Sequence, residues 1–257
     1  VMFIFQPAEE GAPEGEQGGA ELMLKQGLFA KRKPEQVFGM HVTSSMPTGM
    51  IGLRSGPAMA SEDSFTIKVM GKQTHGSRPW SGVDPIVASA QIINSVQTII
   101  SRQVDITKAP AVVSFGAING GIRSNIIPDE VELIGTIRTF DQDMRADIKV
   151  KLAEVAANAA KTVGATAVTV IQPGYPVTVN NPELVSKMRP VIASVVGDNM
   201  LIEPGLITGA EDFSYYALET PGMFFFLGVT PADQDINNVA SNHSPAFYVD
   251  ESALKVG

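Results

Sequence analysis

The chain has 257 residues, of which 44% are hydrophobic and 18% are charged. This length can bury a sizeable core, as one large domain or two medium ones. The 27 acidic residues outnumber the 19 Lys and Arg, and the net charge of -8 disfavours nucleic acid and anionic membranes as partners. The sequence has no Cys, which excludes disulfides and thiolate ligands within these residues.

The first five residues, Val1 to Phe5, are all apolar, which predicts a buried strand of a parallel sheet. A natural chain seldom begins inside a strand without Met, and the residues after Asp250 indicate the start of a helix. We therefore expect both ends to be cut from a longer protein. A cytoplasmic location is expected, although a secretory signal could have been lost with the missing N-terminus, and no apolar run is long enough to span a bilayer.

Further elements of an α/β domain are expected on both sides of a central segment. A Gly-rich acidic loop precedes a short helix near residues 20–26, which Gly27 stops. A second buried strand is expected at residues 37–42, followed by turns and connections at residues 46–56. Near the C-terminal end, the expected elements are a helix at residues 182–196, a strand near Leu201, a helix after Asp212 and a strand at residues 223–227.

The central segment alternates between strand and helix patterns. Apolar residues alternate with polar ones from Phe65 to Met70, and they recur at helical spacing from Asp84 to about Arg102. Three more strands, at residues 111–115, 130–138 and 165–171, and a helix at residues 141–163 complete the series. The order of strand, helix, strand, strand, helix, strand predicts a ferredoxin-like layer, one antiparallel sheet covered by two helices.

These patterns predict an α/β fold in which a mainly parallel domain is interrupted by an inserted α+β domain. The expected boundaries are residues 1–59 for the first part of the parallel domain, 60–173 for the insertion and 174–257 for the second part. The sequence has no Gly-x-Gly, no P-loop and no Gly-x-Ser-x-Gly elbow. Nicotinamide and serine-hydrolase chemistry therefore lose their usual sequence support.

The strongest local signal is the pair of adjacent carboxylates Glu9 and Glu10, just past the expected first strand. Ligands of open α/β sheets gather at that edge. In a metal site one carboxylate can bind the metal while its neighbour takes a proton from water. The alternative is a solvated acidic loop, since Glu14 and Glu16 follow.

The only three histidines lie beside strand ends or in segments with Gly and Pro: His41, His75 and His243. A lone His is more often structural, but three in loops beside an acid pair favour metal chemistry. Asn125 could be a polar residue of the site or a turn residue. Arg138 could be a site residue or equally a surface cation. A helix cap explains Asp212 without any function.

Five segments, taken in order, resemble the aminoacylase and carboxypeptidase family of dinuclear metallohydrolases, in particular its hippurate hydrolases and auxin-conjugate hydrolases. The segments are Phe5-Gln6-Pro7-Ala8-Glu9-Glu10-Gly11, Gly39-Met40-His41-Val42, Gly135-Thr136-Ile137-Arg138-Thr139-Phe140, Glu211-Asp212-Phe213-Ser214 and His243-Ser244-Pro245. The resemblance covers essentially the whole chain. It departs at two points: a Cys-x-His ligand segment lies upstream of the double Glu in the family, and Ala210 stands where Gly is usual.

The resemblance implies a metallopeptidase-type catalytic domain, truncated here, with a lid and dimerisation domain inserted. It implies that Glu9 is the general base. Glu10, His41 and His243 would be metal ligands. His75 and Asn125 would bind the scissile carbonyl or its oxyanion, often from the partner subunit, and Arg138 would bind the substrate carboxylate.

The implied reaction is hydrolysis of the amide bond of an N-acyl amino acid or a related amide by two divalent ions. The ligands suit zinc, manganese, cobalt or nickel. A homodimer formed through the lid is expected. Two alternatives remain: a non-catalytic binding or dimerisation protein of the same fold, and a peptidase that acts on short peptides.

Overall fold

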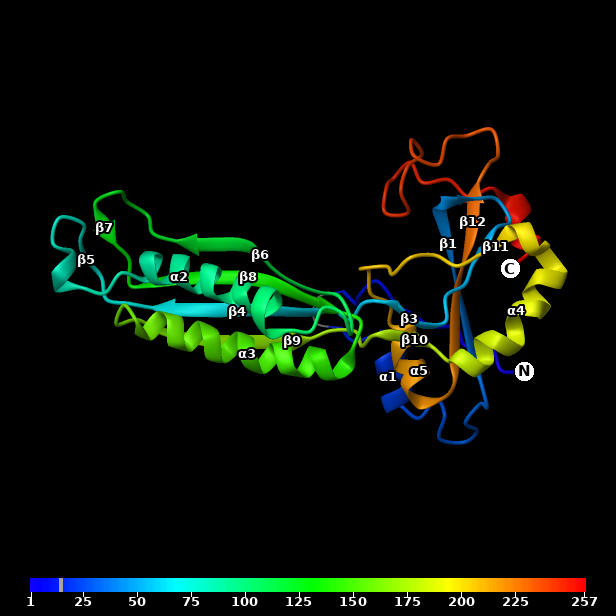
Figure 1. The fold of residues 1–257 in the computed structure, drawn as a ribbon, viewed down its shortest axis with the longest axis horizontal. Coiled ribbons are helices and arrows are strands. Elements are labelled where there is room, and N and C mark those ends of the chain that lie inside the picture. The colour runs from blue at the N-terminus through cyan, green and yellow to red at the C-terminus, as the bar shows by residue number, and fades with distance from the viewer. Residues whose placement is uncertain (14–15) are drawn as a thin grey trace. The chain divides into compact units, whose positions relative to one another are not determined.

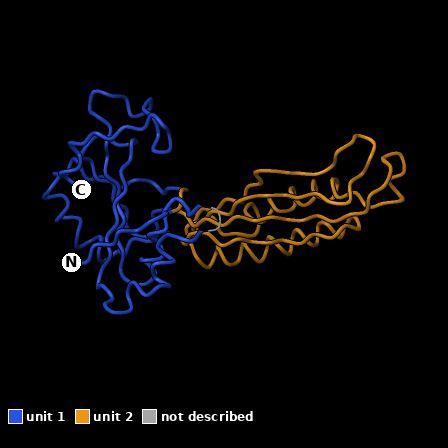
Figure 2. The backbone as a smooth tube through the Cα atoms, turned by 180° about the vertical axis from the view of Figure 1, so that it is seen from behind, with its two compact units in different colours: residues 1–59, 178–207, 211–257 blue, residues 60–177, 208–210 orange. Residues whose placement is uncertain are grey.

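A computed structural model describes residues 1–13 and 16–257; Glu14 lies outside the described residues. The chain divides into two compact units, coloured separately in Figure 2. Unit 1 comprises residues 1–59, 178–207 and 211–257, and unit 2 comprises residues 60–177 and 208–210. In the described part of the chain, no helix has the length and apolar character needed to cross a membrane.

Unit 1 is a mixed sheet with helices (Figure 1). Its elements are α1 (Gly19–Lys25), β1 (Val37–Pro47), β2 (Ile51–Gly52), β3 (Gly56–Met59), β10 (Thr178–Asn180), α4 (Pro182–Val196), η3 (Asp198–Met200), β11 (Leu201–Ile202), α5 (Phe213–Glu219), β12 (Gly222–Thr230) and η4 (Glu251–Lys255). The strand order is β1-β12-β2-β11, and β10 pairs with β3 in a separate ribbon. β1 with β12 and β11 with β2 are parallel, whereas β12 with β2 is antiparallel.

Alternate side chains of β12 point to opposite faces of this sheet, as the period of a strand requires. Met223 and Leu227 belong to the apolar cluster that includes α4, whereas Phe224 belongs to the cluster that includes α1 and α5. In β1, a Cβ at Gly39 would lie 2.7 Å from both the Phe213 and Phe224 rings. Gly39 therefore lets these rings pack directly against the strand that carries His41.

The predicted strand at residues 1–5 is wrong. These residues form no strand, and Val1, Phe3 and Phe5 are exposed. An apolar run becomes a strand only where a neighbouring strand accepts and donates its hydrogen bonds. Among the described residues, no strand pairs with this segment. The region of expected turns at residues 46–56 also contains the short β2.

Unit 2 is an antiparallel sheet packed against two helices. Its elements are β4 (Asp63–Met70), β5 (Thr74–His75), η1 (Pro79–Ser81), α2 (Pro85–Thr98), a π-helical turn η2 (Ile99–Gln103), β6 (Ala111–Gly120), β7 (Ile126–Ile127), β8 (Glu130–Thr139), α3 (Gln142–Lys161) and β9 (Thr166–Pro173). The strand order β6-β8-β4-β9 follows the split β-α-β pattern. Asp84 and Asp141 cap α2 and α3 through their carboxylates.

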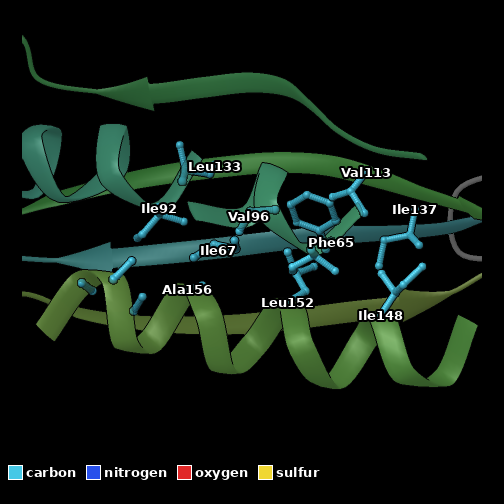
Figure 3. Packing of buried hydrophobic residues seen from close by; sticks show 14 of the residues in the cluster. Phe65, Ile67, Ile92, Val96, Val113, Leu133, Ile137, Ile148, Leu152 and Ala156 are labelled. Atoms are coloured by element: carbon cyan, nitrogen blue, oxygen red, sulfur yellow. The ribbon is translucent and has the colours of Figure 1, made fainter. Parts of the chain in front are cut away.

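The core of unit 2 is one continuous apolar cluster, drawn in Figure 3. Phe65 and Ile67 of β4 face Ile92 of α2 and Leu152 of α3, and all four side chains are fully buried. Because every second residue of β4 enters this cluster, the alternation visible in the sequence has a direct structural cause.

One charged side chain, Asp63, is also fully buried in unit 2. Its carboxylate accepts hydrogen bonds from Arg145 Nε and Nη2, each at 2.7 Å, and lies 2.7 Å from Lys149 Nζ. Two cations therefore compensate one buried anion.

Candidate metal centre

Glu9 follows a strained turn in unit 1. Ala8 has a φ of 58°, and it is the only non-glycine residue with positive φ in the described chain. Such a conformation costs about 1–2 kcal/mol for a residue with a Cβ. Two main-chain bonds hold the turn: Gly19 N donates to Pro7 O at 2.9 Å, and Gly11 N donates to Ala8 O at 3.3 Å. Strain at one residue before a candidate catalytic acid is typical of a site whose geometry is fixed by its surroundings.

Asp212 holds the residues on both sides of this turn. Its carboxylate accepts hydrogen bonds from Gln6 Nε2, at 2.8 and 2.7 Å, and from Ala20 N at 2.7 Å. Tyr216 donates its hydroxyl to Gln6 Oε1 at 2.8 Å. The sequence interpretation of Asp212 as the cap of its own helix is wrong, because its side chain makes no capping bond to α5. The carboxylate serves α1 instead, because Gly18, the residue before α1, has no side chain to cap it.

Three carboxylates gather at this point. Oxygen atoms of Glu9, Glu211 and Asp212 lie within 4.8 Å of one another, and both Glu211 and Asp212 are buried. Burial and, to a smaller extent, the charge of the neighbouring Glu9 raise the pKa of Glu211 to about 8. Burial also raises the pKa of Glu9, as do the charges of Glu10 and Asp212, whereas His41 lowers it. A cluster of like charges in a water-poor setting is the arrangement that a bound cation would relieve.

His41 lies in β1 opposite Phe226 of β12. Its Nδ1 lies 2.6 Å from the carbonyl oxygen of Val42. A carbonyl only accepts hydrogen bonds, so Nδ1 carries the proton and donates it. Nε2 is therefore unprotonated and keeps its lone pair. This arrangement is usual for a histidine that binds a metal through Nε2.

His243 and Glu10 approach each other at the surface of unit 1, with 4.0 Å between Nδ1 and Oε1. The loop of His243 is attached to β1 by its neighbour Asn242. Asn242 Nδ2 donates to Val42 O at 2.6 Å, and its Oδ1 accepts from Ser44 N at 3.1 Å. The same Val42 carbonyl therefore orients His41 and anchors the loop of His243.

The predicted ligands have donor atoms of the kind that divalent cations bind, but the structure does not group all three. Among the described residues, the one group of three possible ligands within 4.8 Å of one another is Glu9, Glu211 and Asp212. Glu10, His41 and His243 offer a carboxylate and two imidazoles, which suit zinc, manganese, cobalt or nickel. Bonds from such ions to nitrogen and oxygen are about 2.0–2.2 Å long, so the donors of Glu10 and His243, 4.0 Å apart, can reach one ion. Among the described residues, no Lys or Arg forms an ion pair with the buried Glu211 or Asp212.

His75 and Asn125 come together in unit 2. His75 of β5 pairs with Ile126 of β7, and Gly76 N donates to the carbonyl of Asn125 at 2.8 Å. Both side chains are exposed. Trp80 follows in η1 and is 79% exposed. This tip of unit 2, residues 72–82 and 121–127, therefore presents His75, Asn125 and an indole to the outside.

Arg138 lies far from that tip. It is near the end of β8, where its Nη2 is 3.9 Å from Glu62. β8 begins at Glu130 beside the tip, and a rise of about 3.3 Å per residue separates Arg138 from Glu130 by about 25 Å. The structure brings His75 and Asn125 together, but it does not bring Arg138 to them.

Sequence reasoning missed Gln6, Glu211 and Asn242 as site residues, and it gave Asp212 a different role. Gln6 and Asn242 stand within three residues of Glu9 and His243, which were predicted for the site, whereas Glu211 and Asp212 lie in a segment that was noted only for its resemblance to the family. No further signal in the sequence marks Gln6, Asp212 and Asn242, because their hydrogen-bond partners lie about 200 residues away.

The whole chain, residues 1–257, matches Peptidase family M20/M25/M40. It is 40% identical to Thermostable carboxypeptidase 2 of Saccharolobus solfataricus, over 100% of this chain and 63% of that protein. It is 34% identical to IAA-amino acid hydrolase ILR1-like 2 of Arabidopsis thaliana, over 100% of this chain and 56% of that protein.

A solved structure of the Bacillus subtilis YXEP protein, described as a dinuclear metal binding peptidase from M20 family, has a TM-score of 0.75 and 31% identity. The match covers 98% of this chain and 60% of that one. The chain thus spans about three fifths of the length of these relatives. Since the match to the family runs from the first residue to the last, the chain belongs to Peptidase family M20/M25/M40, a family of hydrolytic enzymes.

Proposed function

We propose that the whole protein hydrolyses the amide bond of N-acyl amino acids or related amides, with Glu9 as general base. The observation that carries the proposal is the environment of Glu9. It is a half-buried carboxylate whose pKa is raised by burial and by Glu10, and His41 lies close enough to lower it. A base works best when its pKa lies near the operating pH, so a raised carboxylate pKa favours this role.

Glu10, His41 and His243 would hold divalent cations, two in the whole protein. Such cations supply Lewis acidity, which polarises a carbonyl and makes water more acidic. The Glu9 carboxylate accepts a proton from the attacking water and delivers it to the nitrogen of the leaving amine. The strained turn at Ala8 fixes the direction from which Glu9 approaches.

Glu9→Gln in the whole protein tests the assignment, with Glu10→Gln as its counterpart. Glu9→Gln should keep the metal content and lower turnover by roughly two to four orders of magnitude, the usual worth of a positioned base. Glu10→Gln should lose metal. Glu35→Gln, at an exposed acid elsewhere in unit 1, is the matched control. Equal metal loss in the two variants, or an active Glu9→Gln, would show that the roles are wrongly assigned.

A panel of substrates is needed to identify the acyl group and the amino acid that the protein prefers. One relative is named a carboxypeptidase and another an IAA-amino acid hydrolase, so both peptides and N-acyl amino acids belong in the panel. N-acetyl and N-benzoyl amino acids should be cleaved faster than dipeptides if the proposal holds. A reversed order would favour a peptidase that acts on short peptides, and metal binding without any hydrolysis would favour a non-catalytic binding protein.

We further propose that unit 2 is a lid that pairs with a second copy. His75 and Asn125 are proposed to bind the scissile carbonyl, and Arg138 the substrate carboxylate. Since about 25 Å separates Arg138 from the tip within one unit, a small substrate could touch both only if the tip came from another copy. The edge strand β6, with exposed Ile118, and the helix α2, with exposed Ile86 and Val87, are the candidate contact surfaces.

Sedimentation of the whole protein tests this pairing. Ile118→Lys on β6 and Ile86→Lys on α2 should each be compared with Val195→Lys, which alters an exposed apolar residue of α4 in unit 1. A dimer that dissociates in either unit 2 variant, but not in the control, would support the proposal. A monomeric unmodified protein at high concentration would contradict it.

A further inference from the structure

We propose that Asp212 is the positioning residue for Glu9 and that it acts through a closed ring of hydrogen bonds. This inference rests on the proposed role of Glu9. Asp212 contacts Glu9 directly, because its main-chain N–H donates a hydrogen bond to the Glu9 carboxylate. Its side chain holds the turn from which Glu9 projects.

The ring runs from Gln6 to Pro7, across to Gly19 and Ala20, on to Asp212 and back to Gln6. The connections between segments are Gly19 N to Pro7 O at 2.9 Å, Ala20 N to Asp212 Oδ2 at 2.7 Å, and Gln6 Nε2 to the Asp212 carboxylate. The ring thereby joins three segments, the turn before Glu9, the start of α1 and the start of α5. None of the three can shift without breaking at least one bond.

The direction of every bond in the ring is determined. The ionised Asp212 carboxylate only accepts hydrogen bonds, so the amide nitrogen of Gln6 must face it. Gln6 Oε1 is thereby left to accept from the Tyr216 hydroxyl. The carboxylate of Asp212 is 2% exposed and accepts from both Gln6 and Ala20. Gly19 lies where a Cβ would come within 2.7 Å of Asp212 Oδ2, so a side chain there would push the carboxylate away. A carboxylate that only capped α1 would need neither Gln6 nor Tyr216.

A polarity swap separates positioning from general damage. Asp212→Asn replaces one of the two oxygens that accept from Gln6 Nε2 with an amide nitrogen, which opposes the Gln6 amide nitrogen. Gln6→Glu places a carboxylate against the Asp212 carboxylate and removes both bonds, so each single change weakens the ring. In the double variant, Glu at position 6 accepts from Tyr216 and from the amide of Asn at position 212, whose oxygen still accepts from Ala20. The double variant therefore closes the ring again through one reversed hydrogen bond, from the amide at position 212 to the carboxylate at position 6, with the same net charge.

The first measurement is amide hydrogen exchange of the purified chain, without metal or substrate. Exchange at Gly19 and Ala20 should become at least tenfold faster in each single variant and return to within threefold of the unmodified rate in the double variant. The second is kinetics of the whole protein, in which each single variant should lower kcat at least tenfold with KM within twofold, and the double variant should recover. Gln26→Glu, the same change at an exposed position at the end of α1, should alter neither.

Exchange that stays slow in the single variants, or stays fast in the double variant, would overturn the ring. Recovery of exchange without recovery of kcat would overturn its positioning of Glu9. If the unmodified protein shows no metal-dependent hydrolysis, the proposed function fails and so does the positioning of a base, while the exchange result still decides whether the ring holds the turn.

Discussion

Each unit buries carboxylates, but the two units compensate them in opposite ways. In unit 2, the fully buried Asp63 lies between Arg145 and Lys149, both within 2.7 Å. In unit 1, Glu211 is also buried, but its neighbours are Glu9 and Asp212, and its side chain accepts a hydrogen bond from Phe213 N at 3.2 Å. The charge of Asp63 is neutralised by cations of its own unit. Glu211 has no such cation, and its strongly raised pKa means that it keeps its proton to higher pH.

This difference contrasts an acid whose charge is balanced within its own unit with an acid of the candidate site. A buried anion with two cations holds together the elements that supply them, here β4 and α3. A buried group of acids without cations costs free energy, and proteins retain such groups mainly where a ligand or a reaction uses them. A buried carboxylate therefore stabilises unit 2 at Asp63 and destabilises unit 1 at Glu211.

Removing the charge of Asp63 should have the largest effect. Asp63→Asn keeps the shape of the side chain but leaves Arg145 and Lys149 without a counter-ion in the interior. Loss of one partner of a buried ion pair costs roughly 3–5 kcal/mol, and urea denaturation should show a loss of this size. Asp147→Asn breaks an exposed pair with Lys151 on α3 and should cost less than about 0.5 kcal/mol. Equal losses would mean that burial of the Asp63 pair contributes nothing.

Removing the charge of Glu211 in unit 1 should increase stability, whereas removing the charge of Asp63 in unit 2 should decrease it. The pKa of Glu211 rises from 4.5 to about 8 on folding, so between these values the unfolded chain loses a proton that the folded chain keeps. Stability in the presence of a chelator should therefore fall as pH rises from about 4.5 to 8. The full pKa change corresponds to at most about 5 kcal/mol, which partial solvent screening reduces to the order of 3 kcal/mol.

Glu211→Gln should remove most of this pH dependence and stabilise the metal-free chain at pH 8. Urea denaturation at pH 5 and pH 8, with EDTA present, measures both effects. Glu35→Gln is the control, and it should leave the pH dependence intact. A Glu211→Gln variant that is less stable than the unmodified chain at pH 8 would contradict the claim that the charge of Glu211 destabilises unit 1.

A smaller effect should follow from loosening the loop of His243. Asn242→Leu removes the hydrogen bonds to Val42 O and Ser44 N while nearly keeping the side-chain volume. The expected cost is about 1 kcal/mol, the net worth of a typical hydrogen bond. Hydrogen exchange at Ser44 should become faster, and metal affinity should fall more than stability does. Unchanged exchange at Ser44 would show that other contacts anchor the loop.

Unit 2 was the more predictable half, because its signals are local. The alternation from Phe65 to Met70 and the helical spacing after Asp84 each come from one face packed on a single core. The helix expected at residues 141–163 corresponds to α3, Gln142–Lys161. A repeating pattern of burial depends on residues that are close in sequence, so the sequence alone is enough to predict it.

The site of unit 1 was harder to predict for the opposite reason. Glu9, Glu10, His41 and His243 were selected by residue type and by a family resemblance. The bonds that organise their surroundings join residues about 200 positions apart, such as Gln6 to Asp212 and Val42 to Asn242. Nothing local distinguishes an Asp that caps its own helix from one that holds another segment. The apolar run at residues 1–5 failed similarly, because a strand depends on a neighbour that its own sequence does not specify.

Trp80 gives the molecule a single optical reporter, since the chain has no other tryptophan. An indole that is 79% exposed already emits as it would in water, so unfolding of either core would change its fluorescence little. A denaturation curve followed by tryptophan emission would therefore report little of the unfolding of either unit. For the same reason, a blue shift in the native protein would mean that something had covered the tip, and the signal would need no attached dye.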